Sequence, residues 1–185
     1  MARLTAYDNT ATGNGGGLYI GDASGEVRNG LFRGNSAATG GGLSAGGTVE
    51  LANHTFVGND STGHGAALSL NGGAPTVLSA VGYANTGLSG CSAADALADD
   101  LVTYSTFFLT TGGADYNGSC LANATENDSL NPVFLSLDTD DAYDDDDLSP
   151  GSASPLRNSG PPSSSYDDRD GSQNDRGHTG GPDAP

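Results

Sequence analysis

Apolar residues in the first half of the chain occur in groups of two or three, and each group is bounded by glycine or asparagine. Leu18, Leu43 and Leu68 begin three such groups at a spacing of 25 residues (18 to 43 and 43 to 68), each behind a run of Gly or Ala. Groups of this length are too short for amphipathic helices and are typical of strands between turns. A fixed period of this size indicates a stacked repeat.

One period predicts three short strands. In the first period they are residues 18–20, a strand around Val27, and residues 31–32. The next period repeats them at 43–45, 49–51 and 55–57. Three strands in roughly 25 residues predict an all-β fold, a right-handed parallel β-helix whose coils rise by about 4.8 Å each.

Equivalent residues of successive coils lie above one another in such a fold, which explains the two positions that repeat. Leu18, Leu43 and Leu68 are predicted to form an inward aliphatic stack. Asn35 and Asn59 are predicted to form an amide ladder at a tight turn. Asparagine tolerates the left-handed backbone of a turn, and its side chain can hydrogen-bond to the next coil.

The repeat weakens along the chain. Residues 1–130 are predicted to form the coils, with clear repeats over 1–87 and a degenerate coil over 88–130 that contains the strand-like run 101–109. Residues 131–185 are predicted to form an irregular, Asp-rich C-terminal cap. Residues 93–100 lack a strand pattern and are interpreted as a loop or as one helical turn. Residues 112–127 also lack one and are interpreted as a loop.

The net charge of the chain limits the classes of partner it is expected to bind. The 185 residues carry 23 acidic and 6 basic side chains, a formal charge of −17, and all the basic residues are Arg. Such a surface repels phosphate backbones, so a nucleic-acid partner is not expected, whereas divalent cations are attracted. No apolar run approaches the roughly 18 residues of a membrane-spanning helix.

Two cysteines, Cys91 and Cys120, each lie in a Gly/Ser-rich stretch. This setting predicts a disulfide that staples two loops, and an extracellular compartment. Two unrelated buried thiols are the alternative. A repeat-like segment begins almost at Met1, so we expect a larger parent chain.

The repeats resemble a known family. Phe32-Arg33-Gly34-Asn35 and Phe56-Val57-Gly58-Asn59 fit an FxxN motif, and Gly41-Gly42-Leu43 is close to a GGA-[ILV] motif. Together they resemble the polymorphic outer-membrane protein repeats of bacterial surface β-helix proteins. The segment from Asn131, with Leu148-Ser149-Pro150-Gly151-Ser152, resembles the closing segment of secreted bacterial β-helix proteins. These resemblances imply a location on the bacterial cell envelope or outside the cell.

Calcium is the metal considered, because it takes several hard oxygen ligands. Asp168, Asp170, Asn174 and Asp175 flank a Gly turn like half of an EF-hand loop, and a capping turn held by side-chain hydrogen bonds is the alternative. A second acidic run is interpreted as a solvated loop, with Ca²⁺ again as the alternative. It comprises Asp138, Asp140, Asp141, Asp144, Asp145, Asp146 and Asp147.

No catalytic residue is predicted. The acids of the repeats fall mostly at turns and out of register: Asp8, Asp22, Glu26, Glu50 and Asp60. The three histidines, His54, His64 and His178, have no metal-ligand spacing and are expected at the surface. A lyase or hydrolase would require carboxylates and Arg clustered on one strand face.

The function expected from the resemblance is that of a non-enzymatic, surface-exposed or secreted β-helix module. It would be adhesin-like and bind a polysaccharide or another cell-surface component. Two alternatives stay open: a fragment of a polysaccharide lyase or glycoside hydrolase of the pectate-lyase-like class, and a calcium-stabilised structural module.

Overall fold

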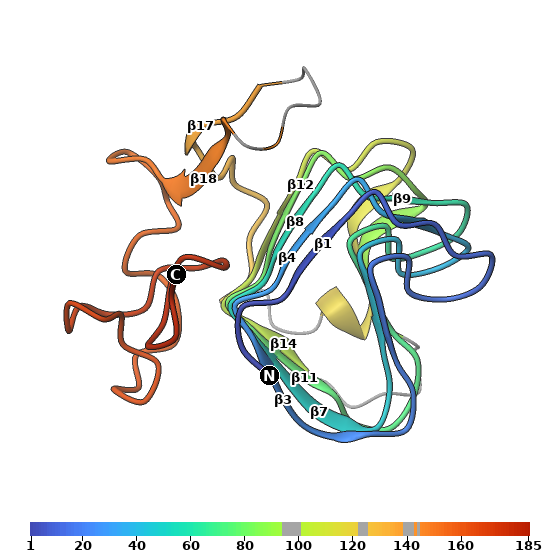
Figure 1. Ribbon diagram of the computed structural model, residues 1–185, viewed down its shortest axis with the longest axis horizontal. Coiled ribbons are helices and arrows are strands. Elements are labelled where there is room, and N and C mark those ends of the chain that lie inside the picture. The colour runs from blue at the N-terminus through green and yellow to red at the C-terminus, as the bar shows by residue number, and fades with distance from the viewer. Residues whose placement is uncertain (94–100, 122–125, 139–142, 144) are drawn as a thin grey trace.

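The chain folds into a right-handed parallel β-helix of about four turns (Figure 1). The structure is a computed structural model that describes residues 1–93, 101–121, 126–138, 143 and 145–185. Seen as in Figure 1, the chain winds clockwise from β1 as it recedes from the viewer. No α-helix occurs in these ranges. The fold class predicted from the sequence is therefore confirmed.

Three parallel sheets form the sides of the solenoid. Sheet 1 contains β1 (Thr5–Tyr7), β4 (Leu31–Arg33), β8 (Thr55–Val57), β12 (Val81–Tyr83) and β15 (Thr106–Phe108). Sheet 2 contains β2 (Leu18–Ile20), β6 (Leu43–Ala45), β10 (Leu68–Leu70), β13 (Ser89–Ala93) and β16 (Ala114–Gly118). Sheet 3 contains β3 (Ser24–Arg28), β7 (Thr48–Ala52), β11 (Thr76–Leu78) and β14 (Val102–Thr103).

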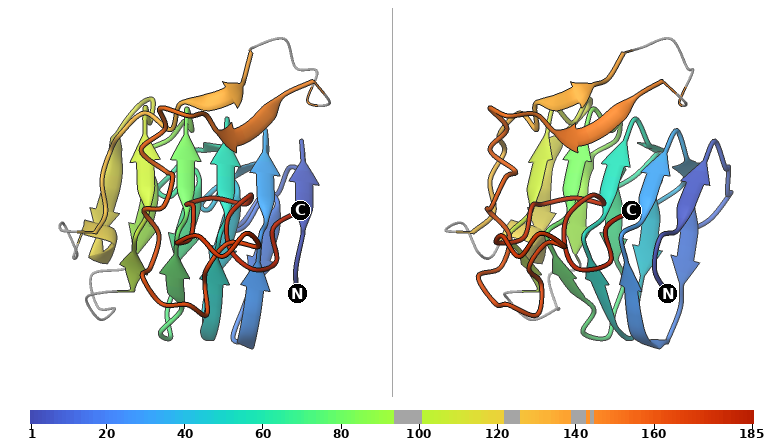
Figure 2. Two further views of the ribbon diagram at one scale, coloured as in Figure 1. Left: turned by 90° about the vertical axis from the view of Figure 1, so that its left-hand side faces the viewer. Right: turned by 60° about the vertical axis from the view of Figure 1, so that its left-hand side comes forward.

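Smaller elements complete the molecule. Two-residue strands β5 (Ser36–Ala37) and β9 (Asp60–Ser61) pair in parallel. An antiparallel pair, β17 (Phe134–Ser136) and β18 (Asp147–Pro150), crosses above the carboxyl ends of the strands of sheet 1 (Figure 2). We call this pair, with the described residues between its strands, the arm. A 3₁₀ turn, η1 (Ser119–Leu121), follows β16.

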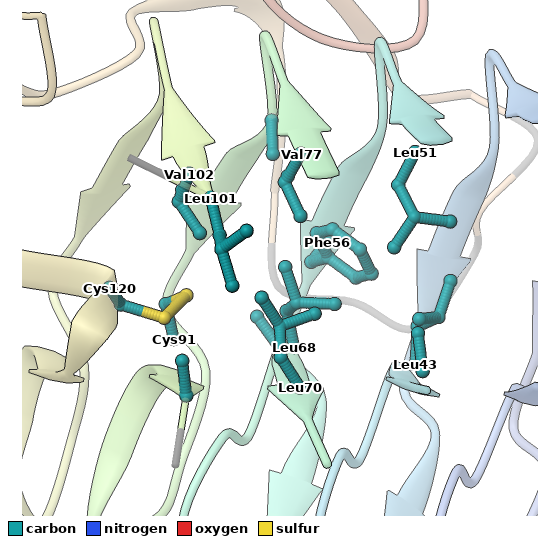
Figure 3. Close-up of a cluster of buried hydrophobic side chains, with 14 of the residues drawn as sticks. Leu43, Leu51, Phe56, Leu68, Leu70, Val77, Cys91, Leu101, Val102 and Cys120 are labelled. Atoms are coloured by element: carbon teal, nitrogen blue, oxygen red, sulfur yellow. A yellow bond between two sulfur atoms is a disulfide. The ribbon is translucent and has the colours of Figure 1, made fainter. Parts of the chain in front are cut away.

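The core consists of side chains stacked from coil to coil. Leu43 pairs in register with both Leu18 and Leu68, and Cys91 continues this row in the next coil (Figure 3). Leu43 and Leu68 are fully buried, whereas Leu18 in the outermost coil is half-buried. Fully burying each leucine contributes about 2 kcal/mol of transfer free energy, so each inner coil is held by the coils on both sides.

The corner after sheet 1 holds the asparagine ladder. The Asn35 N–H and its Nδ2 donate to Asn59 Oδ1, both at 3.0 Å. Asn59 repeats this pattern toward Asn85 at 2.9 and 3.0 Å, and Asn9 donates to Asn35 in the same way. Gly58, just before Asn59, has φ +63°, the left-handed backbone that glycine adopts without a steric cost.

The corner between sheets 3 and 1 carries a second row of left-handed residues that the sequence reading did not single out. Arg3, Asn29, Asn53, Ser79 and Tyr104 have φ between 52° and 59°. These turns direct the side chains of Asn29, Asn53 and Ser79 toward the C-terminal segment, which buries them. This corner is where the C-terminal segment binds.

Residues 174–184, which we call the strap, run back along this corner from the last coil to the first. Figure 2 shows the strap as the red trace crossing the coils. Arg176 Nη1 donates to Thr106 Oγ1 at 2.8 Å in the last coil, and the His178 N–H donates to Thr55 Oγ1 at 2.9 Å. Arg3 Nη2 in the first coil donates to the carbonyl of Ala184 at 3.0 Å. The Asp-rich segment thus lies along the side of the coils.

Residues 112–127 are structured in part, which corrects their interpretation as a loop. They contain β16 and η1, and β16 pairs with β13 in parallel. Tyr116 packs edge-on against Phe107, with ring centroids 5.3 Å apart, and its hydroxyl donates to the carbonyl of Ser105 at 2.8 Å. One inward aromatic residue thereby anchors a strand whose composition is polar. The other stretch interpreted as a loop or helical turn, 93–100, lies outside the described residues from position 94 onward.

The predicted disulfide is confirmed, between Cys91 of β13 and Cys120 of η1. Their Cα atoms are 6.2 Å apart and both residues are fully buried. The bond joins Cys91, which continues the leucine row, to the 3₁₀ turn that follows β16 (Figure 3).

Removing this bond should lower the stability of the whole domain. A cross-link between residues 29 positions apart lowers the conformational entropy of the unfolded chain, which stabilises the fold by about 3.6 kcal/mol. We expect the Cys91→Ala/Cys120→Ala variant to lose this amount in urea unfolding. Reductant should destabilise the wild type and leave the variant unchanged; an equal response of both proteins would contradict the prediction.

Candidate groove between sheet 1 and the arm

A groove of about 410 Å³ lies between the outer face of sheet 1 and the arm. Pockets for small ligands typically enclose about 300–1,000 Å³. The groove is lined by residues of three sheet strands, the corner that follows them and the arm. They are Arg33, Gly34, Val57, Gly58, Tyr83, Ala84, Asn131, Phe134, Leu137, Asp138 and Tyr143.

The floor of the groove is one row of outward side chains. Side chains of a strand alternate between its two faces, so when Phe32 and Phe56 point into the core, their neighbours Arg33 and Val57 point outward. Parallel pairing in register extends the row through both ends of the sheet. The complete row is Tyr7, Arg33, Val57, Tyr83 and Phe108.

The sequence analysis did not predict this row as a site, although a sequence pattern marks it. Four of its five members stand two positions before an asparagine of the ladder, as in Tyr7-x-Asn9 and Tyr83-x-Asn85, whereas Phe108 precedes Thr110. What the sequence does not state is which outward row stays accessible. The strap occupies the other row, at Thr55 and Thr106.

Aromatic rings form the apolar wall. Tyr83 meets Phe134 of the arm edge-on, with ring centroids 5.8 Å apart, and stacks on Phe108 at 6.2 Å. Tyr83 and Phe134 are each partly exposed, so part of each ring lines the groove while its neighbours fix its position. The wall is therefore apolar and held in place from two sides.

Arg33 fastens the arm to the floor. It forms an ion pair with Asp146, and the exposed fractions of the two side chains are 8 % and 2 %. Its guanidinium carbon also lies 4.0 Å from the ring centre of Tyr143, a cation–π contact. The Tyr143 hydroxyl donates to Asp8 Oδ1 at 2.8 Å. Burial raises the pKa of Tyr7, which packs edge-on against Tyr143, and nearby Arg33 partly opposes this rise.

Carboxylates converge at the arm end of the groove. Oxygens of Asp138, Asp145 and Asp146 lie within 4.8 Å of one another, and Asp146 Oδ1 also accepts the Asp138 N–H at 2.9 Å. Hydrogen bonds to Asp147 from the Ser149 side chain and from the Ser149 N–H lower the pKa of Asp147. The other three acids of this run, Asp140, Asp141 and Asp144, lie outside the described residues.

The four residues predicted as calcium ligands sit at the base of the strap. Asp168 accepts the N–H groups of Asp175 (3.0 Å) and Gly181 (2.5 Å). Asp170 accepts the N–H and hydroxyl of Ser172. The carboxylates thus serve backbone donors, as in the alternative of a capping turn, and burial raises the pKa of Asp168.

Asn174 lies deeper and joins the strap to the coils. It is fully buried, and its Oδ1 accepts from Ser79 Oγ at 2.9 Å and from Asn53 Nδ2 at 3.2 Å. Asp175 Oδ1 accepts the Asn158 N–H at 2.6 Å. Calcium at these four residues stays a prediction.

Replacing Asp168 by Ala separates the two interpretations. Hydrogen bonds to a charged acceptor are each worth about 1.5–3 kcal/mol, so we expect Asp168→Ala to lose about 2 kcal/mol of unfolding free energy in the presence of EDTA. Urea unfolding with EDTA and with added Ca²⁺ measures the loss. A loss that appears only with Ca²⁺ would instead assign these residues to a metal.

The outer face of sheet 3 corrects one expectation about the acids. Glu26 and Glu50 pair in register, and Arg28 forms ion pairs with both, at 3.1 and 3.0 Å. The Tyr166 hydroxyl donates to Glu50 Oε1 at 3.3 Å. The expectation that these acids are out of register was wrong because the coil length varies: the leucines are 25 residues apart (18 to 43), whereas β3 and β7 pair at an offset of 24 (26 to 50).

The expectation of surface histidines is also wrong for His54. This side chain is fully buried against Phe32, with ring centroids 5.8 Å apart, and its Nδ1 accepts the Gly30 N–H at 2.9 Å. The left-handed Asn53 resets the alternation of the chain, so the next residue points inward. His178 is half-buried in the strap, and His64 is exposed as expected. Burial lowers the pKa of His54 and of His178, each to about 4.

Comparison with known proteins gave no match to a family model, a curated protein or a solved structure. Within the described residues, no helix has the length and apolar character that crossing a membrane requires.

Proposed function

We propose that this chain is a non-enzymatic, exported bacterial β-helix module that binds carbohydrate in the groove between sheet 1 and the arm. The groove itself carries this proposal: aromatic rings and polar groups line one cavity of about 410 Å³. Sugar rings present an apolar face of C–H groups and a rim of hydroxyls, and aromatic rings beside hydrogen-bonding groups complement both. Export is supported by the disulfide, since such bonds persist in oxidising compartments.

The geometry of the groove suits binding in a preformed site. The arm is held to the floor by the ion pair of Arg33 with Asp146 and by the stacking of Arg33 on Tyr143. A site whose walls are fixed before the ligand arrives loses less conformational entropy on binding. We therefore expect free and bound forms to have the same arm position.

Titration calorimetry with short oligosaccharides tests this function. Tyr83→Leu keeps an apolar side chain and removes the aromatic ring, so we expect it to weaken binding up to about tenfold. Tyr19→Leu is the matched control, because Tyr19 is an exposed tyrosine of sheet 2. No binding to a broad oligosaccharide panel, or equal effects of the two substitutions, would refute carbohydrate binding in the groove.

A second candidate, a glycoside hydrolase or polysaccharide lyase, is favoured by the cluster on sheet 3. Glu26, Arg28 and Glu50 lie together on one strand face, as the enzymatic alternative requires. Arg28 is engaged by both carboxylates, so it would have to leave one of them to act on a substrate. Reducing-end and ultraviolet assays on neutral and acidic polysaccharides test this candidate. Turnover that Glu50→Gln abolishes would establish an enzyme.

A further inference from the structure

We infer that the groove selects a cationic amino sugar, a saccharide with a protonated primary amine, over its neutral and acidic counterparts. This inference rests on the proposed carbohydrate-binding function and names the ligand class. It follows from how the charges around the groove are distributed. The aromatic wall alone would accept any sugar.

The positive charge of the floor is already neutralised. Arg33 is the basic residue among those that line the groove, and it pairs with Asp146 while both side chains are under a tenth exposed. Arg33 is largely covered, so a ligand carboxylate would have to compete with Asp146 for it, and displacing Asp146 would leave that buried carboxylate unpaired. Breaking a buried ion pair in this way is strongly unfavourable. Arg33 therefore holds the arm and does not serve as an anion receptor.

Among the described residues, the other charged side chains placed at the groove are carboxylates. Asp138 lines the groove and is exposed, and exposed Asp145 lies within 4.8 Å of it. Asp8, which follows β1 in the first coil, accepts the Tyr143 hydroxyl and adds a carboxylate beside the arm. Around one guanidinium there are thus four carboxylates, Asp146 included, on a chain of formal charge −17. This field attracts an ammonium group and repels a uronate.

The aromatic wall adds to this preference. The face of an aromatic ring is the negative part of its quadrupole and attracts a cation within about 6 Å of its centre. Tyr83 and Phe134 both line the groove that Asp138 also lines. An amino sugar can therefore place its ring against the wall and its ammonium group between ring face and carboxylate.

Calorimetry at pH 6 in EDTA tests the selection with defined ligands. The ligands are the β-1,4-linked glucosamine disaccharide, its N-acetylated form, cellobiose, digalacturonate and a linear aliphatic diamine. We expect the glucosamine disaccharide to bind at least about tenfold more tightly than cellobiose and the N-acetylated form, and digalacturonate to bind most weakly. The preference should shrink as salt rises.

Two variants that remove the same charge locate the effect. Asp138→Asn should weaken glucosamine binding about threefold more than it changes cellobiose binding, the contribution of one exposed charge. Asp170→Asn, on an exposed turn beside the strap, should change neither. Thermal melting of both variants verifies that the fold is retained.

The outcomes separate this inference from the proposed function. If cellobiose binds as tightly as the glucosamine disaccharide, and Tyr83→Leu weakens both, carbohydrate binding stands and the selection for amines falls. If the diamine binds as tightly as the disaccharide, or if Asp138→Asn and Asp170→Asn act alike, the attraction is a general one to an acidic surface and the inference is overturned. If no saccharide binds, the proposed function falls with it.

Discussion

Replacing Asn59 by Ala is expected to cost about 4 kcal/mol of unfolding free energy. Asn59 is fully buried, and its Oδ1 accepts both the backbone N–H and Nδ2 of Asn35. Its Nδ2 donates to the carbonyl of Phe32 and to Asn85 Oδ1. Alanine would leave the buried Asn35 N–H without its acceptor and would remove one hydrogen bond each from Asn35 Nδ2, the Phe32 carbonyl and Asn85 Oδ1. An unpaired buried group costs about 1–3 kcal/mol. Urea unfolding measures the loss.

Asn9 provides the control, because its N–H and Nδ2 donate to the next asparagine of the ladder in the same way from the outermost coil. It is exposed, so water can replace the partners that Asn9→Ala removes. We expect that variant to lose at most about 1 kcal/mol. Similar losses at Asn9 and Asn59 would show that the ladder acts through turn propensity alone, and that burial of its hydrogen bonds is unimportant.

Acidification from pH 7.5 to pH 4 is expected to destabilise the fold by about 6 kcal/mol. Burial lowers the pKa of His54 and of His178 to about 4, from the ordinary value of 6.5. Between these values the unfolded chain binds a proton at each histidine and the folded chain does not, so stability rises with pH. Each histidine contributes about 3 kcal/mol, which is fully present above pH 6.5 and is lost as the pH falls toward 4.

The two depressed histidine pKa values should dominate this pH range. The pKa values of Asp147 and Asp170 are lowered from 3.8, so their contribution is lost only at more acidic pH. Burial raises the pKa of Asp168, and this carboxyl opposes the loss.

Urea unfolding at intervals between pH 7.5 and 4 measures the slope. The His54→Gln/His178→Gln variant should flatten it whatever its stability at neutral pH. His64→Gln, at an exposed position, should leave the slope unchanged. A slope that survives the double substitution would assign the acid sensitivity to carboxylates.

The period of the sequence was sufficient for the fold, because in a solenoid each coil contacts the next at equivalent positions. Leu18, Leu43 and Leu68 recur in the sequence and stack in the structure, and Asn35 and Asn59 recur and hydrogen-bond. In such a fold, residues one period apart in the sequence are also in contact in the structure. The period was less reliable for register on sheet 3, where coils of unequal length brought Glu26 beside Glu50.

The sequence by itself thus determined the three-strand coil, the inward leucines and the asparagine corner, since these depend on neighbours one period away. Only the tertiary structure decided the groove. Its roof at Phe134 and its floor at Tyr83 are far apart in the chain, and their contact depends on where the arm folds back. The strap decided which outward row remained free by covering Thr55 and Thr106. Contacts between segments that share no period leave no repeating signal, so they arise only when the whole chain is folded.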